Sequence, residues 1–211
     1  MKKSIIIKWV GVFFTLSLPI GLSWANAPAV EIRVVGNLAA PGCSVITPNN
    51  GVYDLGILPT SSAKSTAVAL APLRQTWRIQ CEADTYLKLL STDNRAFAGG
   101  ASKMPTSYNL LAPEGGDALG YYYVEISNAT VNGKPARLLT QGGGDSATAT
   151  RMRSGDRMEW GQAEGAMRSG RLFSADITIY PFLTTTGVAK SRTFEGEKLE
   201  GSMTMGFEFG L

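Results

Sequence analysis

The chain has 211 residues, with 20 lysines and arginines, 17 aspartates and glutamates, and no histidine. The lack of histidine excludes catalysis by Ser-His-Asp or Cys-His groups and removes the commonest protein ligand of transition metals. The net charge of +3 equals the contribution of Lys2, Lys3 and Lys8, so the rest of the chain is neutral overall. The composition therefore predicts no metal or cofactor site and no surface for nucleic acid.

Residues 1–25 have the pattern of a secretory signal peptide. After the lysines comes an uncharged, mainly apolar run at residues 9–22, whose 14 residues are fewer than the roughly 20 that a membrane-spanning helix needs. Residues 23–25 match the small-x-small cleavage rule. We expect export through the inner membrane and cleavage after Ala25. Cleavage after Ala27 also fits, and an uncleaved membrane anchor is the alternative.

Removing 25 of the 211 residues leaves 186, enough for one large β-domain or two small ones, and we expect one. This mature chain opens on an alternating segment. Val30, Ile32 and Val34 alternate with Glu31 and Arg33, which is the period of a β-strand with one apolar face. Such a strand could pair within its own domain or with another chain.

The chain has two cysteines, Cys43 and Cys81. In an oxidising compartment such a pair is expected to form one disulfide. The bridge would close a loop of 38 residues, which the chain-entropy model values at roughly 4 kcal/mol. Two free buried thiols are the alternative.

The middle of the chain keeps the period of two. Strands are predicted around residues 77–80, 86–90, 122–126 and 176–180. Asn132-Gly133 lies between two apolar runs and predicts a tight hairpin. Residues 154–169 fit no pattern well, and no long helix is expected.

Three tyrosines, residues 121–123, lie at the start of one of these strands. Tyrosines in a strand usually divide between the core and a half-wet outer face, and we expect that division here. A surface that binds sugar is the alternative.

The longest alternation ends the chain. Five apolar side chains share one face, and small or polar residues occupy the other. The apolar residues are Met203, Met205, Phe207, Phe209 and Leu211. Together these short strands predict an all-β fold, most simply a β-sandwich.

Convergent carboxylates are the remaining route to catalysis, because a pair of them can hydrolyse glycosides. Asp84 with Asp93, or Glu195 with Glu197, are candidates, although each has the setting of a turn or surface acid. We expect no enzyme, and keep a secreted hydrolase as one alternative.

A more specific pattern comes from the order of the motifs. The alternating N-terminal segment runs through residues 36–42 into Cys43, and Tyr53-Asp54-Leu55-Gly56 follows. A predicted strand at residues 76–81 then ends at Cys81, and the last residues of the sequence form an alternating strand. This order resembles the subunits of chaperone–usher pili (fimbriae) and is similar to a pilin-like branch longer than the common major pilins. The resemblance covers essentially the whole mature chain.

The resemblance implies an immunoglobulin-like β-sandwich that lacks its last strand. Residues 1–25 would be the signal peptide, residues 26–35 a donor-strand extension, and residues 36–211 the pilin-like domain. A periplasmic chaperone would fill the gap first, and the extension of the next subunit would replace it at an outer-membrane usher. The product would be a head-to-tail fibre on the cell surface that supports adhesion.

The resemblance also implies roles for single residues. Val30, Ile32 and Val34 match the donor strand, and Cys43 and Cys81 match the disulfide between the first two strands. Met203, Met205, Phe207, Phe209 and Leu211 match the strand that lines the gap and pairs with the chaperone, which would also grip the Leu211 carboxylate.

The chain departs from the common pilins at three points. Val30 lies near a position where they carry glycine, Gly210 lies where they often carry tyrosine, and the extension is short. The alternative from another class is a secreted, monomeric, carbohydrate-binding β-sandwich that would use exposed aromatic side chains such as Trp160 or Tyr121.

Overall fold

A computed structural model gives the structure of the chain. It describes Arg33, Val35 and residues 41–58, 68–95, 107–111, 118–140, 145–146, 149–162, 166–184 and 199–210. The chain divides into two units, Met1–Asn37 and Leu38–Leu211. The predicted signal peptide, Val30, Ile32, Val34 and Leu211 lie outside the described residues.

The described chain is built of strands and contains no α-helix, which confirms the all-β prediction. The elements are β1 (Cys43–Ile46), the 3-10 helix η1 (Pro48–Gly51), β2 (Val68–Ala69), β3 (Leu73–Asp93), β4 (Tyr108–Leu111), β5 (Ala118–Val131), β6 (Lys134–Pro135), β7 (Arg137–Thr140), β8 (Asp145–Ser146), β9 (Ala149–Met152), β10 (Arg157–Gly161), β11 (Gly170–Leu183) and β12 (Met203–Gly210). No helix in this part of the chain is long and apolar enough to cross a membrane.

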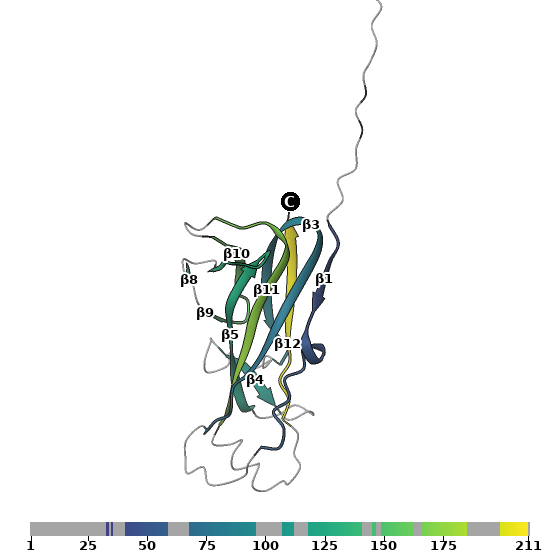
Figure 1. Cartoon of the computed structure of the whole chain (residues 1–211). Coiled ribbons are helices and arrows are strands. Elements are labelled where there is room, and N and C mark those ends of the chain that lie inside the picture. The colour runs from purple at the N-terminus through teal and green to yellow at the C-terminus, as the bar shows by residue number, and fades with distance from the viewer. Residues whose placement is uncertain are drawn as a thin grey trace, which may run out of the picture. The chain divides into compact units, whose positions relative to one another are not determined.

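The strands form a curled antiparallel sheet that is organised by β3 (Figure 1). The first half of β3 pairs with β1 on one side and with β11 on the other, and β11 continues to β5. The second half of β3 pairs with β12 on one side and with β10 on the other, and β10 continues to β7. One 21-residue strand therefore joins two sets of pairings.

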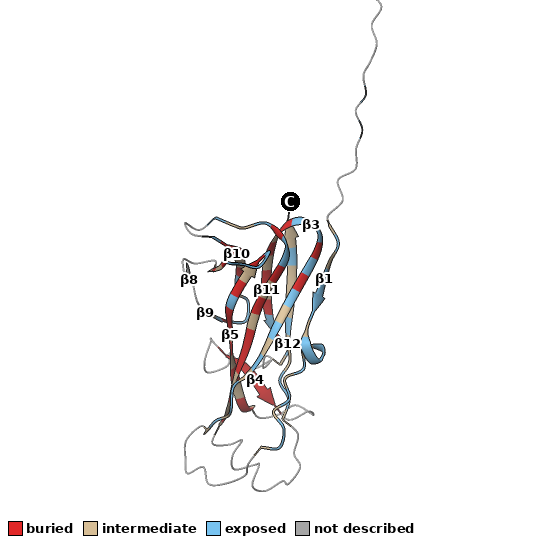
Figure 2. Cartoon of the chain, in the orientation of Figure 1, coloured by how far each residue is buried: buried red, intermediate tan, exposed pale blue. Residues whose placement is uncertain are grey.

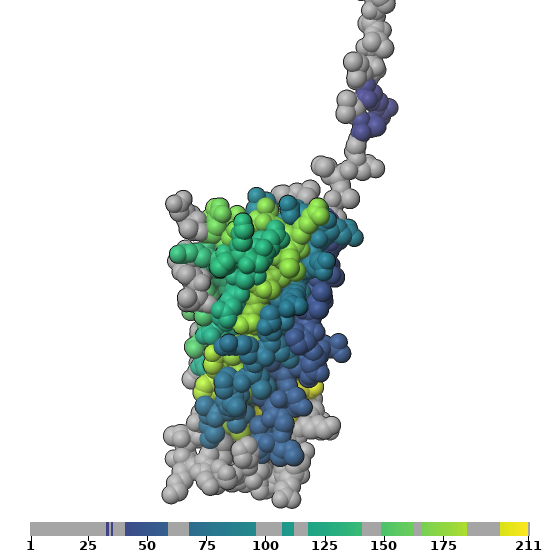
Figure 3. Space-filling view, viewed as in Figure 1, coloured from purple at the N-terminus to yellow at the C-terminus, as the bar shows by residue number. Residues whose placement is uncertain are grey.

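The change of partners falls at residues 81–84 of β3. The pairing with β11 jumps from Leu172 opposite Gln80 to Gly170 opposite Thr85. In Figure 1 β3 arches over at this point, and β12 runs back beside its second half. Figure 3 shows β5, β11, β3 and β1 side by side on one face of this unit.

The core contains side chains from the strands that pair with the first half of β3 and from those that pair with its second half. Figure 2 shows β5 and β11 mostly buried, β12 mostly intermediate and β1 mostly exposed. Trp160 on β10 is 1% exposed and meets the Phe173 ring edge-on, with ring centroids 6.1 Å apart. The suggestion that Trp160 is an exposed sugar-binding ring is therefore wrong. A large apolar side chain gains most when it is fully buried.

The predicted hairpin at Asn132-Gly133 is confirmed. Val131 pairs with Lys134, which leaves a two-residue loop. Both loop residues have positive φ, 50° at Asn132 and 73° at Gly133. This conformation matches the twist of the flanking strands, and glycine adopts it without steric cost.

Changing Gly133 to alanine is expected to lower the free energy of unfolding by about 1 kcal/mol, because a Cβ is unfavourable in the left-handed region. Urea unfolding followed by tryptophan fluorescence measures the change. Gly206→Ala is the control, since a Cβ there would meet only the Leu90 carbonyl oxygen, at 3.9 Å. Equal losses in the two variants would contradict this account of the turn.

A buried carboxylate fixes the end of β3 where β12 begins. Asp93 accepts hydrogen bonds from the backbone N–H and the Nδ2 of Asn109 and from the N–H of Arg95. The Arg95 guanidinium in turn pairs with Glu200, just before β12. This network positions the first residues of β12 against β3, because buried polar groups hold geometry when all of them are satisfied.

Candidate functional site

Two strands that pair with β3, namely β1 and β12, each have one edge without a described partner strand. Among the described residues, β1 pairs only with β3, and β12 also pairs only with β3. Each strand therefore has one edge whose N–H and C=O groups take no part in a described ladder. An open edge of this kind is a template for pairing with a further strand.

A small apolar depression, with room for about one water molecule, lies among strands β3, β10, β11 and β12. It is lined by Trp77 and Ile79 from the first half of β3, Leu89 from its second half, Trp160 from β10, Ala175 and Ile177 from β11, and Met205 and Phe207 from β12. All eight side chains are apolar, so the site offers no polar group to a small hydrophilic ligand. We call this depression and the two open edges the groove.

The apolar face of β12 forms one wall of the groove. Met203, Met205, Phe207 and Phe209 pack against the core but are only partly buried. They lie opposite residues of β3 that are almost fully covered, such as Leu89 opposite Phe207. The alternation predicted for this strand is confirmed for residues 203–210.

The other wall, formed by β1 and the segment after it, exposes apolar side chains. Val45 lies opposite Ile79, which is 2% exposed, and shares its face of the sheet, yet Val45 itself is 42% exposed. Ile46, Val52 and Ile57 are exposed as well. Within the described chain nothing covers this edge, so apolar surface there remains available to a partner.

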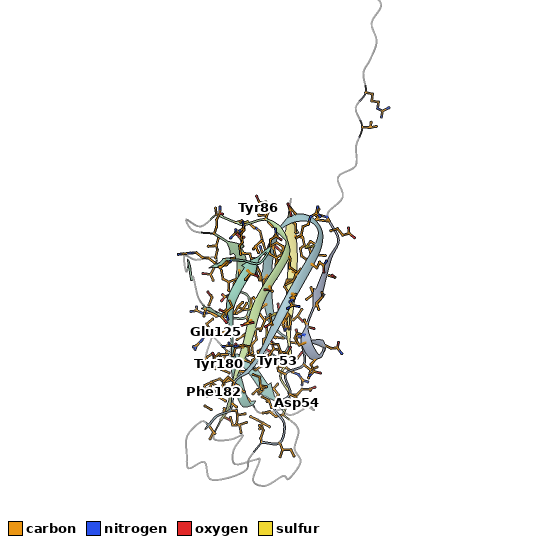
Figure 4. All side chains as sticks on the ribbon, viewed as in Figure 1. Tyr53, Asp54, Tyr86, Glu125, Tyr180 and Phe182 are labelled. Atoms are coloured by element: carbon orange, nitrogen blue, oxygen red, sulfur yellow. A yellow bond between two sulfur atoms is a disulfide. The ribbon has the colours of Figure 1, made fainter. Side chains whose placement is uncertain are left out.

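Tyr53 packs against the core and bonds to Ile177, one of the residues that line the groove. Tyr53 is labelled in Figure 4. Its hydroxyl donates a hydrogen bond to the Ile177 carbonyl oxygen at 3.1 Å. Burial raises the pKa of the Tyr53 hydroxyl well above its usual value, so this donor stays protonated. The Gln75 Nε2 donates to the Val52 carbonyl oxygen at 2.6 Å and holds the same segment. These two bonds hold the segment after β1 against β11 and β3.

The predicted disulfide is confirmed and fastens β1 beside the groove. Cys43 and Cys81 are bonded and lie directly opposite each other in the β1–β3 ladder. Because β1 has only four residues and one described partner, the covalent link fixes an edge strand that few hydrogen bonds hold.

The sequence predicted three groups of site residues: the donor strand, the disulfide pair and the C-terminal strand. The structure describes two of them, the disulfide pair and residues 203–209, and both pack against the same core. The donor residues Val30, Ile32 and Val34 lie outside the described residues, as does Leu211. Sequence reasoning assigned no role to Trp77, which lines the groove, or to Tyr53, which bonds to Ile177. Their only local signals were the alternation before Cys81 and the Tyr-Asp-Leu-Gly motif.

A cluster of aromatic rings covers another part of the sheet and bears on the carbohydrate alternative. Tyr121 stacks on Phe182 at 5.1 Å between centroids, and Tyr123 meets Phe182 edge-on at 5.5 Å. The Arg151 guanidinium lies 4.3 Å above the Tyr123 ring. Tyr122 points into the core, which confirms the predicted division of the tyrosines. These ring faces are already engaged with one another and with arginine, which leaves less of them for a sugar.

The proposed acidic pairs do not form a convergent site among the described residues. Asp93 is buried against Asn109, whereas the Asp84 side chain is mostly exposed and lies 3.7 Å from the Arg171 Nε. Glu195 and Glu197 are outside the described residues. Nor does the described chain hold a cluster of acidic, cysteine or histidine side chains that could bind a metal ion.

No protein-family model matches this chain, and no curated protein matches it.

Proposed function

We propose that the protein is a structural subunit of a bacterial surface pilus, assembled by donor-strand exchange, and acts by interaction rather than catalysis. The observation that carries the proposal is the groove, where apolar side chains lie between two strands that each pair on one side only. A strand inserted there gains main-chain hydrogen bonds at the open edges and buries alternate side chains, which is β-strand addition.

In this proposal the two sets of pairings around β3 are the layers of an immunoglobulin-like sandwich that lacks its last strand. Residues 26–35 form the donor extension and residues 36–211 the pilin-like domain, after removal of the signal peptide at residues 1–25. Because each subunit gives a strand through one region and receives one through another, the contact is head-to-tail and produces a fibre.

The partners follow from the same reasoning. An isolated subunit exposes apolar surface, so a periplasmic pilus chaperone covers the groove during transit. An outer-membrane usher then exchanges the chaperone for the extension of the next subunit, and the finished fibre supports adhesion at the cell surface.

Deleting residues 26–35 tests the proposal. The shortened chain, expressed in the periplasm with a pilus chaperone, is expected to form a soluble one-to-one complex but no polymer, since it keeps the groove and loses the donor strand. Size-exclusion chromatography and electron microscopy measure the two outcomes. Polymers formed by the shortened chain would refute the assignment.

A matched control separates loss of the donor from loss of the fold. The complete mature chain in the same host should form polymers, and a synthetic peptide of residues 26–36 should stabilise the shortened chain as a monomer. A shortened chain that is equally stable with and without the peptide would favour the monomeric carbohydrate-binding alternative.

A further inference from the structure

The outward face of β12 carries a single charged side chain. Its four outward residues are Thr204, Gly206, Glu208 and Gly210, which alternate with the apolar residues that face the core. The Glu208 side chain is half exposed and its Oε1 lies 3.6 Å from the Arg157 Nη2 on β10. Lys88 on β3 lies directly opposite Glu208, and β10, which carries Arg157, also pairs with β3, so both of these basic neighbours of Glu208 come from β3 or a strand paired with it.

The N-terminal alternating segment carries opposite charges on its polar face. Glu31 and Arg33 alternate with Val30, Ile32 and Val34. Arg33 is exposed, and Val35, which continues its phase, is 76% exposed. Glu31 and Arg33 are two residues apart. If this segment pairs with β12, the register of the pairing therefore determines which of the two lies opposite Glu208.

An inserted strand gains most from antiparallel pairing along β12. The open edge of β12 has eight residues and that of β1 has four, and antiparallel ladders are slightly more stable per residue than parallel ones. Apolar faces match only in registers that differ by two residues, since a shift of one reverses every side chain.

Four registers place Ile32 opposite an apolar residue of β12. Ile32 opposite Met203 leaves both charged residues away from Glu208. Ile32 opposite Phe207 brings Glu31 opposite Glu208, and like charges directly opposite each other are destabilising. Ile32 opposite Met205 brings neither charged residue opposite Glu208. Only Ile32 opposite Phe209 brings Arg33 opposite Glu208 and forms a favourable cross-strand pair.

The glycines of β12 favour the same register. With Arg33 opposite Glu208, Val35 lies opposite Gly206, where the nearest atom to an added Cβ is the Leu90 carbonyl oxygen at 3.9 Å. The open surface over Gly206 can therefore take the Val35 side chain. Val34 then faces Phe207, at the wall of the apolar depression.

We infer that the strand received by the groove is residues 30–35 of a second copy of this chain, antiparallel to β12, with Arg33 opposite Glu208 and Ile32 opposite Phe209. The inference rests on the proposed function and adds to it the identity of the partner and the register. Because donor and acceptor charges occur in the same sequence, one copy of the chain can serve as donor to the next.

Synthetic peptides of residues 26–36 test the register on the chain that lacks residues 26–35, whose groove no neighbouring copy can fill. Binding is measured by the shift in melting temperature across a peptide titration. The Arg33→Glu peptide is expected to bind roughly tenfold more weakly than the natural peptide, because a favourable pair becomes a repulsive one. The Glu31→Lys peptide should bind about as well as the natural one, since Glu31 lies opposite Gly210. A peptide with the same residues in an order that removes the alternation is the control.

Exchanging the charges completes the test. On the shortened chain with Glu208→Arg, the Arg33→Glu peptide is expected to recover its lost affinity. Tighter binding of the Glu31→Lys peptide to the shortened chain without that change would overturn this register in favour of Ile32 opposite Phe207. Equal binding of the natural and Arg33→Glu peptides would overturn the charge pairing while leaving strand addition intact. If no peptide binds better than the control, the proposed function itself fails.

Discussion

Replacing Cys43 and Cys81 together with alanine is expected to lower the free energy of unfolding by about 4 kcal/mol. The bond links residues 38 positions apart, so its loss frees a long loop in the unfolded chain. It also releases β1, a four-residue strand whose only described partner is β3. Because small domains are stable by only about 5–15 kcal/mol, the loss is a large fraction of the total.

Urea unfolding of the natural and cysteine-free chains, followed by tryptophan fluorescence, measures this loss. Ser44→Ala is the control, since Ser44 lies beside Cys43 on the same strand and its side chain is exposed. A decrease below about 1 kcal/mol in the double variant would mean that the ladder between β1 and β3 holds the strand unaided.

Changing Phe207 to aspartate is expected to weaken binding of the natural 26–36 peptide at least about a hundredfold. Phe207 lines the apolar depression, and an inserted strand would bury the new carboxylate with no positive partner among the lining residues. Leaving a charge buried and unpaired costs several kcal/mol. The same peptide titration by melting temperature measures the change.

Thr204→Asp provides the matched control, because it adds the same charge on the same strand. Thr204 lies on the opposite face and is exposed, so its carboxylate stays in water. It should change binding by less than about threefold. Comparable losses in the two variants would show that peptide binding depends on net charge and not on the apolar groove.

The sequence predicted those features of the fold that depend on local patterns. The Asn132-Gly133 turn and the alternation at residues 203–210 each specify their own structure through conformational preference and period. The disulfide was predicted from a pair of cysteines together with a predicted export signal. None of these predictions needed information on distant contacts.

The extent of β3 was harder to foresee. The predicted strands at residues 77–80 and 86–90 are parts of one strand, and the residues between them include no glycine or proline that would end it. Trp77, Ile79, Leu87 and Leu89 keep the same phase, so the inward face continues across the arch. The exchange of partners at residues 81–84 depends on β11 and β12, which are distant in sequence.

Two other features of the groove arise from long-range contacts. Tyr53 bonds to Ile177, which lies 124 residues further along the chain, and the local sequence pattern does not predict that contact. Trp160 lies in a segment without a clear pattern, and its burial depends on Phe173 and the neighbouring strands. The open edges of β1 and β12 likewise became visible only when all the described pairings were known.

The position of the disulfide also sets how far the molecule can lengthen under tension. Force applied at the two ends of the chain passes from Cys43 directly to Cys81 through the sulfur atoms, so the 38-residue span between them carries no load. At the reach of an extended backbone, that span would otherwise add roughly 130 Å when the domain is pulled apart. A chain subjected to shear would thus yield in a shorter step than its length implies, and would retain a closed loop from which to refold.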